Sequence, residues 1–255
     1  MSVRAFFLAA AALSSTPAFA EGLFNFEPAQ SRAYFALFGG GNFTPDSFFT
    51  GVSNPAPGVP GPTGIAGAPI TVNLDYEVGY QVGGAVGVSM PFKYWKVFHP
   101  RLEVEVSYAD LQVNDGAFNG GDQIFEGDQS TLFVFLNNYS DIRWSDNQRF
   151  VPYVGGGLGV AFVDADIGYF PASATTPGAT FAVNGRDTAF ASHIAAGVSA
   201  PFGGGAEAFV EGRYTKIYSA KLERDFVGGG ADLFVADLSD SLNEFTAMAG
   251  VRWRF

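Results

Sequence analysis

The sequence predicts an all-β protein, an eight-stranded antiparallel up-and-down β-barrel with short turns at one end and long loops at the other. Three observations favour this fold. Apolar and polar side chains alternate with a period of two along much of the chain, aromatic residues make up 16% of it, and it contains 33 glycines. Alternation places apolar and polar side chains on opposite faces of a strand. No run of eighteen apolar residues follows the first twenty, so the sequence predicts no membrane-spanning helix.

The first twenty residues have the pattern of a signal peptide. Arg4 supplies a positive charge, residues 5–13 form a short apolar stretch, and residues 18–20 give the small-x-small cleavage motif Ala-Phe-Ala. The alternative is a buried N-terminal helix, and the apolar stretch is too short to span a membrane. The pattern predicts cleavage after Ala20, a lead-in at residues 21–30 and a single β-barrel domain at residues 31–255.

The last twelve residues form the clearest predicted strand. From Glu244 to Phe255 every second side chain is apolar, and those between them are polar or small. Residues 75–90, 101–108 and 207–214 show the same split, whereas residues 32–43, 151–163 and 188–200 are apolar or small on both faces. In Gln129–Ile142, Phe133 and Phe135 fall on the polar face. A bulge could reset that strand, so the pattern leaves its register open.

The lengths of the connections predict the topology. Short links at residues 91–100, 145–150 and 201–206 alternate strictly with long ones at residues 44–73, 114–128, 164–187 and 220–243. An even number of strands then places both termini and the short turns on the periplasmic side, with the long loops outside. The link Thr44–Asn73 is rich in proline, which lacks the N–H that a ladder needs, so we expect it to form no ladder.

A soluble barrel and a transmembrane barrel would both show this alternation, but they place the polar face on opposite sides. Charged side chains gather on the polar faces of adjoining strands: Glu103, Glu105, Glu211, Arg213, Arg252 and Arg254. At that density we expect them to pair inside a lumen, which in a barrel of eight strands is just wide enough for side chains to fill. Aromatic residues near the strand ends match the interfacial girdles of membrane barrels. The transmembrane arrangement is therefore favoured.

Several segments resemble one family of bacterial proteins. Residues 151–161, Val-Pro-Tyr-Val-Gly-Gly-Gly-Leu-Gly-Val-Ala, and residues 137–141, Asn-Asn-Tyr-Ser-Asp, resemble the fifth and fourth strands of opacity-protein and outer-membrane-protein-A-like barrels of the surface-antigen type. Ser140 stands where that family usually has tyrosine. Val251, Trp253 and Phe255 resemble the alternating apolar end on which such barrels close. The resemblance implies a Gram-negative outer membrane and recognition of this C-terminal strand by the barrel-assembly machinery.

The sequence offers few residues for chemistry. There is no cysteine, and the two histidines are His99, in a short link, and His193. His193 follows Ser192, and neighbouring strand residues point to opposite faces, so the two cannot act as nucleophile and base. The acidic long loops lack the spacing of a twelve-residue calcium loop. We therefore expect no catalytic, cofactor or metal site and no enzymatic activity.

The charge balance bears on partners. Cleavage would remove Arg4 and leave 13 basic against 25 acidic residues, a net charge of −12, which argues against nucleic acid. The expected partners are outer-membrane lipid and lipopolysaccharide, the barrel-assembly machinery, and an extracellular ligand bound through the loops. The leading hypothesis is a structural or surface-interaction barrel, adhesin- or antigen-like, with a filled lumen. A narrow porin-like channel for small solutes or ions is the alternative, and a lipid-modifying enzyme is a third hypothesis.

Overall fold

The computed structural model describes residues 24–26, 32–54, 66–145, 147–171, 180–227 and 233–255. The predicted signal peptide, its cleavage site and four of the prolines in the link Thr44–Asn73 lie outside these residues. In the part that is described, no helix is long and apolar enough to cross a membrane.

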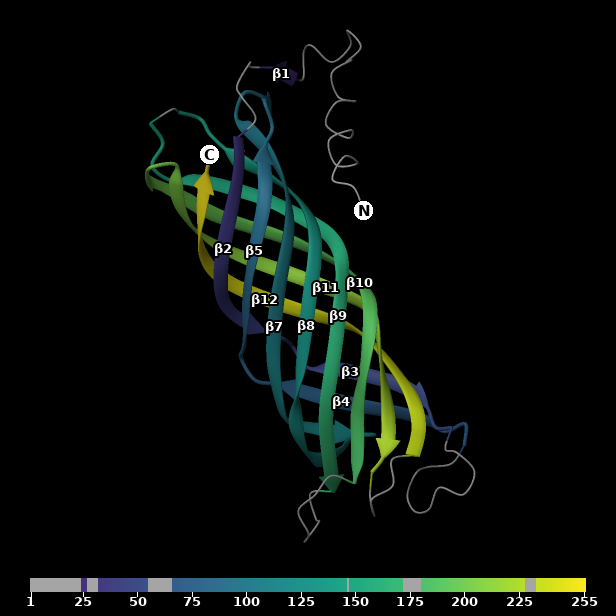
Figure 1. Cartoon of the computed structure of the whole chain (residues 1–255). Helices are drawn as coiled ribbons and strands as arrows, with labels where there is room; N and C mark the ends of the chain where they lie inside the picture. Colours follow the sequence, from purple (N-terminus) through teal and green to yellow (C-terminus); the bar gives the residue numbers. More distant parts are fainter. Residues whose placement is uncertain (1–23, 27–31, 55–65, 146, 172–179, 228–232) are drawn as a thin grey trace, which may run out of the picture.

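The described chain is built from twelve strands (Figure 1). They are β1 (Phe24–Phe26), β2 (Arg32–Phe43), β3 (Ser47–Val52), β4 (Pro69–Tyr76), β5 (Gly79–Ser89), β6 (Phe92–Tyr94), β7 (Phe98–Phe118), β8 (Gly121–Ile142), β9 (Val151–Pro171), β10 (Phe181–Gly203), β11 (Ala206–Phe226) and β12 (Leu233–Arg254).

Antiparallel pairings join most of these strands into a closed ring. β2 pairs with β5, β5 pairs with β7, and each strand from β7 to β11 pairs with the next. β12 then returns to β2, with ten residue pairs between Tyr34–Phe43 and Phe245–Arg254. The all-β, antiparallel barrel predicted from the sequence is therefore confirmed, although the structure has more strands than were predicted.

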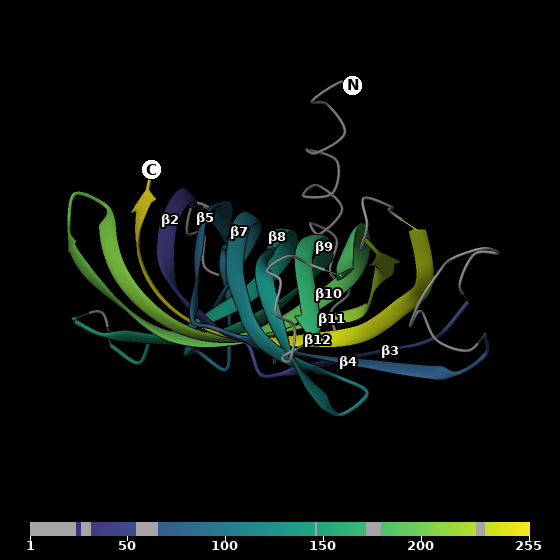
Figure 2. The same ribbon diagram turned by 90° about the horizontal axis from the view of Figure 1, so that it is seen from below.

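The additional strands extend the ring at both ends. β3 pairs with β12 and β4 pairs with β7, so this hairpin continues the wall beyond β2 and β5 (Figures 1 and 2). The expectation that Thr44–Asn73 forms no ladder was wrong for Ser47–Val52 and for the segment that starts at Pro69. Pro69 is the first residue of β4, a position that tolerates proline in a strand. At the opposite end, β1 pairs with β6.

Other predicted long loops are also largely strand. β7 and β8 are joined by a tight turn at Asn119 and Gly120, both with positive φ, as a two-residue hairpin requires. The strands from β7 to β12 are each 21–23 residues long. This is about twice the 9–11 residues that a tilted membrane strand needs.

Part-way along these strands the outward side chains change from apolar to polar, and the inward ones from polar to apolar. On β9 the outward side chains are apolar from Val154 to Phe162 and become acidic at Asp164 and Asp166. The inward side chains change in the opposite sense. The lumen near the C-terminus is polar, whereas Ile167 and its neighbours, nearer β3 and β4, are buried and apolar. Here 'above' means toward β3 and β4, which is toward the bottom of Figure 1. The outer half is the part beyond Asp110 on β7, Ser130 on β8 and Asp164 on β9, with residues 181–187 of β10, 219–226 of β11 and 233–241 of β12, together with β3 and β4. The outward apolar surface below it is the apolar band.

Inside the ring, glycines on one strand pair with aromatic side chains on the next. The pairs are Tyr34 with Gly87, Phe38 with Gly83, Phe135 with Gly159, Tyr139 with Gly155, Tyr153 with Gly197, and Phe209 with Gly250. A Cβ atom on any of these glycines would overlap the paired ring. The glycines therefore let the rings lie flat against the wall and leave the centre of the lumen for longer side chains.

We expect Gly197→Ala to lower the free energy of unfolding by about 1–3 kcal/mol, because the new methyl group would meet the Tyr153 ring and the Val210 carbonyl. Gly212→Ala, at the residue on β11 paired with Ala196, is the matched control, since a Cβ there meets no atom within 4 Å. Guanidinium titration of the protein refolded in phospholipid vesicles measures both. Equal losses for the two variants would contradict the role of the aromatic–glycine pairs.

Candidate functional site

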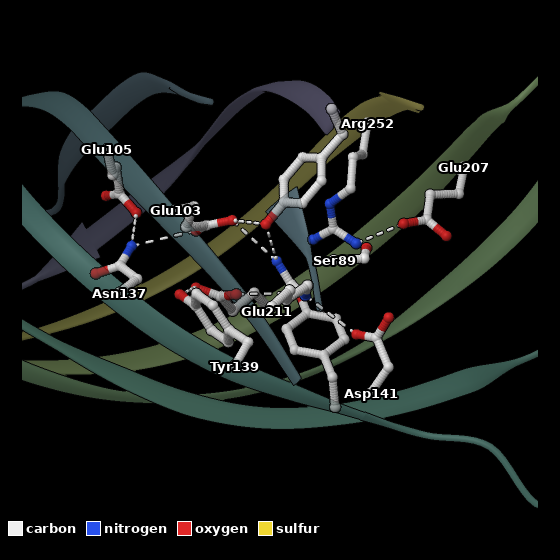
Figure 3. A network of polar contacts seen from close by, with 12 residues as sticks. Ser89, Glu103, Glu105, Asn137, Tyr139, Asp141, Glu207, Glu211 and Arg252 are labelled. Atoms are coloured by element: carbon white, nitrogen blue, oxygen red, sulfur yellow. Dashed lines mark hydrogen bonds and ion pairs between the residues drawn. The ribbon is translucent and has the colours of Figure 1, made fainter. Parts of the chain in front are cut away.

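A buried group of charged and polar side chains fills the lumen below the outer half (Figure 3). We call it the lumen cluster. It consists of Tyr34 from β2, Arg101, Glu103 and Glu105 from β7, Asn137, Tyr139 and Asp141 from β8, Tyr153 from β9, His193 from β10, Glu207, Glu211 and Arg213 from β11, and Arg252 and Arg254 from β12. On each strand the members are separated by two residues or a multiple of two, so the pleat turns them all inward.

Arg213 lies at the centre of the cluster. Its two terminal nitrogens donate to the carboxylate of Glu105 at 2.5 and 2.9 Å, and its Nε and Nη2 donate to Glu211 at 3.1 and 2.9 Å. The guanidinium thus joins β11 to β7 across the lumen, with two parallel bonds to one carboxylate. Charge-assisted bidentate pairs of this kind are among the strongest and most directional polar contacts in proteins.

Asn137 connects the two glutamates of β7. Its side-chain amide donates to Glu105 at 2.8 Å and to Glu103 at 3.2 Å (Figure 3). Its oxygen lies 2.8 Å from Nε2 of His193. Glu103 also accepts hydrogen bonds from Tyr34 and Arg101, at 2.7 and 2.9 Å. The carboxylates are therefore satisfied by several donors at once, as buried charges require.

Arginines predominate at the end of the cluster nearest the C-terminus. The carboxylate of Asp141 forms ion pairs with the guanidinium groups of Arg101, Arg254 and Arg143, at N–O distances of 3.1, 3.3 and 3.6 Å. The carboxylate of Glu207 forms ion pairs with Arg252 at 2.5 Å and with Arg254 at 2.9 Å (Figure 3). Two carboxylates are thus shared among four guanidiniums, which ties β7, β8, β11 and β12 together at this end.

The six charged residues named from the sequence fall into two groups. Glu105, Glu211 and Arg213 are in direct contact, and Asn137 connects Glu103 to them. Arg252 and Arg254 instead pair with Glu207, which the sequence analysis did not single out. It also missed Arg101 and the β8 members, among them Asp141. Arg101 stands in the same alternating run as Glu103 and Glu105, so the pattern could have indicated it. The β8 members needed the register that the pattern left open.

That register contains no bulge. β8 pairs without a shift along Gln129–Ile142, both with β7 and with β9. Phe133 and Phe135 therefore point inward, as do Asn137, Tyr139 and Asp141. The bulge considered from the sequence is wrong. The lumen changes from polar to apolar along this strand, so the mixed inward face is the native arrangement.

Above the cluster the interior contains a large apolar core, with buried polar side chains such as Gln129 and Glu244 at its base. Phe133 and Phe135 stack with ring centres 5.4 Å apart, and Phe135 packs edge-on against His193. Higher in the outer half the core includes Phe125, Ile167, Val183 and Leu222, each at most 2% exposed. The outer half thus has the construction of a water-soluble β-structure, with an apolar interior and a polar exterior.

One cation lies within that outer core. The guanidinium carbon of Arg224 is 4.0 Å from the ring centre of Phe181 and 4.4 Å from that of Phe118, and Nε donates to the Tyr169 hydroxyl at 2.5 Å. Cation–π contacts of this kind stabilise a desolvated guanidinium. Burial raises the pKa of Tyr169 to about 12. Tyr169 is therefore neutral at physiological pH and accepts the arginine's hydrogen bond through its oxygen.

His193 and Ser192 lie on opposite faces of β10, as the alternation predicts. His193 is buried in the lumen, whereas Ser192 points outward and its hydroxyl lies 3.1 Å from that of Tyr218. Within the described residues there is no group of three or more His, Asp or Glu side chains arranged to hold a metal ion.

No protein-family model matches the chain, and no curated protein matches it significantly. Several solved structures do match the chain in fold. The outer membrane protease OmpT from Escherichia coli is 9% identical, with a TM-score of 0.50, covering 89% of this chain and 98% of that one. Neisserial surface protein A is 12% identical with a TM-score of 0.40 (88% and 99% covered). Ail of Yersinia pestis, solved with a heparin analogue, is 10% identical with a TM-score of 0.37 (89% and 100% covered).

The chain has the outer-membrane β-barrel fold. The first of these likenesses carries that conclusion, and at 9% identity it concerns the fold alone. The course of the strands agrees with it, because the ring of this barrel closes between its first long strand and its last.

We expect Arg213→Met to lower the free energy of unfolding by about 3–5 kcal/mol, because it leaves Glu105 and Glu211 buried without their cation. Replacing all three, as Glu105→Gln, Glu211→Gln and Arg213→Met, should recover most of the loss, since no buried charge is then unpaired. Guanidinium titrations in vesicles compare the two proteins. A triple variant less stable than Arg213→Met would show that the cluster does not act as a unit.

Proposed function

We propose that this chain is an integral outer-membrane β-barrel protein with a structural or surface-interaction role, adhesin- or antigen-like, and a lumen filled by side chains. Its transmembrane wall is the ring of β2, β5 and β7–β12, eight strands. The predicted signal peptide supports export. The C-terminal residues Val251, Trp253 and Phe255 support recognition by the barrel-assembly machinery, and Trp253 stacks on Phe35 of β2 at 4.7 Å, at the closure of the ring.

The reversal of polarity is the observation that carries this proposal. In the apolar band, large side chains such as Leu136, Leu158 and Ile194 are each more than 60% exposed to the surroundings, which suits hydrocarbon and not water. The band covers about nine residues of β9, from Val154 to Phe162, which is the length a tilted strand needs to cross a membrane.

Aromatic residues mark both edges of the band. Trp95, Trp144, Phe150, Phe202 and Phe255 are exposed at the periplasmic end. At the opposite edge stand Tyr80, Tyr108 and Tyr218, each exposed by 36% or more. Rings at the headgroup levels anchor membrane barrels in depth. With the band placed in this way, the whole outer half stands clear of the lipid.

The outer half offers a large, rigid and acidic surface. Its outward side chains include Asp115, Asp122, Glu126, Asp128, Asp166, Glu223 and Asp237, all exposed. The buried core behind them fixes the strands, so the surface is presented by regular sheet as well as by loops. These features support a surface-interaction role in which a partner binds the projecting sheet.

The filled lumen favours this role over a channel. A solute entering from outside meets the apolar core first and the salt-bridged lumen cluster next, both of them buried. We propose no lipid-modifying activity, because His193 lies in this closed interior and is hydrogen-bonded to Asn137. The partners that we propose are outer-membrane lipid, lipopolysaccharide and an extracellular ligand of the outer half.

Cysteine labelling on intact cells tests the placement, since the native chain has no cysteine. We expect Asp166→Cys and Asp237→Cys, which face outward in the outer half, to react with a membrane-impermeant maleimide. Leu158→Cys, in the apolar band, is the matched control and should remain unlabelled until the cells are solubilised in detergent. Labelling of Leu158→Cys on intact cells, or protection of both outer positions, would refute the placement.

Planar bilayer recordings test the sealed lumen. We expect the purified protein to show no steady conductance, because polar and apolar side chains fill the interior along its length. Phe135→Ala combined with Phe133→Ala removes two rings of the apolar core and should produce more frequent brief openings than the wild type. Large, steady currents from the wild-type protein would favour the narrow channel instead.

A further inference from the structure

A shallow groove crosses the apolar band where four neighbouring strands carry small residues. It is lined by residues 196–198 of β10, 210–212 of β11, 247–249 of β12 and 39–40 of β2, with a volume of about 560 Å³. The outward members are Gly39, Ala196, Val198, Val210, Gly212, Ala247 and Ala249. They form two adjacent rows, because Ala196, Gly212 and Ala247 pair in register, as do Val198, Val210, Ala249 and Gly39.

The groove is open on the outside of the wall. A Cβ atom added at Gly212 would meet nothing within 4 Å, and Ala196, Ala247 and Ala249 are all exposed. Elsewhere the band carries large side chains, such as Leu132 and Leu136 on β8. An apolar hollow at this depth in a membrane does not hold water, so hydrocarbon or another protein must fill it.

The side chains above the groove indicate what fills it. The outward residues that follow Gly212 on β11 are Tyr214, Lys216 and then Tyr218. The hydroxyl of Tyr214 donates to Asn243 at 2.7 Å, and Nζ of Lys216 lies 5.4 Å from the ring centre of Tyr218. Lys216 therefore stands at the edge of the band, directly above the groove, with its amine at the headgroup level.

The exposed basic residues at the upper edge of the band and in the outer half are gathered on the same side of the barrel. Among the described residues of these two regions, the basic side chains not buried in the core are Arg186, Lys216 and Lys221, and all three belong to β10 or β11. Arg186 is paired with Asp164 at 2.7 Å. Acidic side chains such as Glu223 and Asp237 are also exposed on this side, farther from the groove. Lys216 places a positive charge at the upper end of the hydrocarbon-lined groove.

We propose that the groove is a binding site for lipopolysaccharide, with one acyl chain in the hollow and a phosphate of the lipid held by Lys216. The site deepens the proposed function and rests on it, because it requires the apolar band to lie in the outer membrane with the outer half outside. It gives the barrel a fixed lipid partner on the β10–β2 side, below the acidic surface of the outer half.

Native mass spectrometry of the protein extracted in mild detergent, with phosphate and fatty-acid analysis of the lipid retained, tests this site. The variants are Gly212→Leu, which fills the hollow from a position with open space, and Lys216→Ala. We expect each to lower the lipopolysaccharide retained per barrel by about tenfold, equivalent to about 1.4 kcal/mol. Val106→Leu on β7, across the ring, and Lys96→Ala, at the periplasmic end, are matched controls that should retain the wild-type amount.

Circular dichroism of each variant establishes that the barrel has folded. Retention that is unchanged in both Gly212→Leu and Lys216→Ala would overturn the proposal. So would retention of phospholipid in place of lipopolysaccharide, or a wild-type dimer that Gly212→Leu converts to a monomer, which would assign the groove to a second copy of the chain. The proposed function fails separately, through the cysteine labelling and the conductance of the wild-type protein.

Discussion

Closure of the backbone ladder between β2 and β12 is the constraint on which the rest of the structure depends. In hydrocarbon an unpaired backbone N–H or C=O costs several kcal/mol, so a sheet can cross the membrane only if its first and last strands meet. Here they meet along Tyr34–Phe43 and Phe245–Arg254 without a shift of register. The residues at this seam are small where the strands are closest, since a Cβ on Gly40 would overlap the backbone at Ala247. The outer wall is hollow beside this seam because the outward residues Gly39, Ala247 and Gly212 of neighbouring strands are also small.

A closed ring has an inner and an outer face, but closure does not decide which of them is apolar. This chain has both arrangements, one at each end of its long strands. Where the wall meets lipid, the interior is free to be polar, and arginine and glutamate pair across it. Where the wall meets water, the interior must be apolar to stabilise the strands, as in a soluble β-barrel. The change occurs over a single pair of residues on β9, between Phe162 and Asp164. The ladders of β9 with β8 and β10 are continuous through that level, so along these strands the outer half is joined directly to the part in the membrane.

The alternation predicted correctly those strand segments on which the outward side chains are apolar and the inward ones polar throughout. Val251, Trp253 and Phe255 stand out because apolar and polar residues alternate there without exception. Phe133 and Phe135 were misjudged because the inward face was assumed to be polar along the entire strand, when the two rings interrupt it between Asn137 and Thr131. Likewise, Ser47–Val52 was assigned to a loop because proline and glycine near it outweighed a short alternating pattern. Contacts across the lumen, such as Arg101 with Asp141, depend on register and curvature, which one strand's pattern does not contain.

The polar and the apolar interior stabilise the barrel through different contacts. The lumen cluster joins strands that are distant in the ring, since Arg213 on β11 holds Glu105 on β7, and so it resists flattening of the barrel within the membrane. The aromatic–glycine pairs act between neighbours and keep the wall thin enough for those long side chains to meet. The apolar core then closes the interior above them. In the described residues the interior is filled at each of these levels, so the surfaces proposed for recognition are outward ones: the small-residue groove toward lipid and the acidic sheet beyond it.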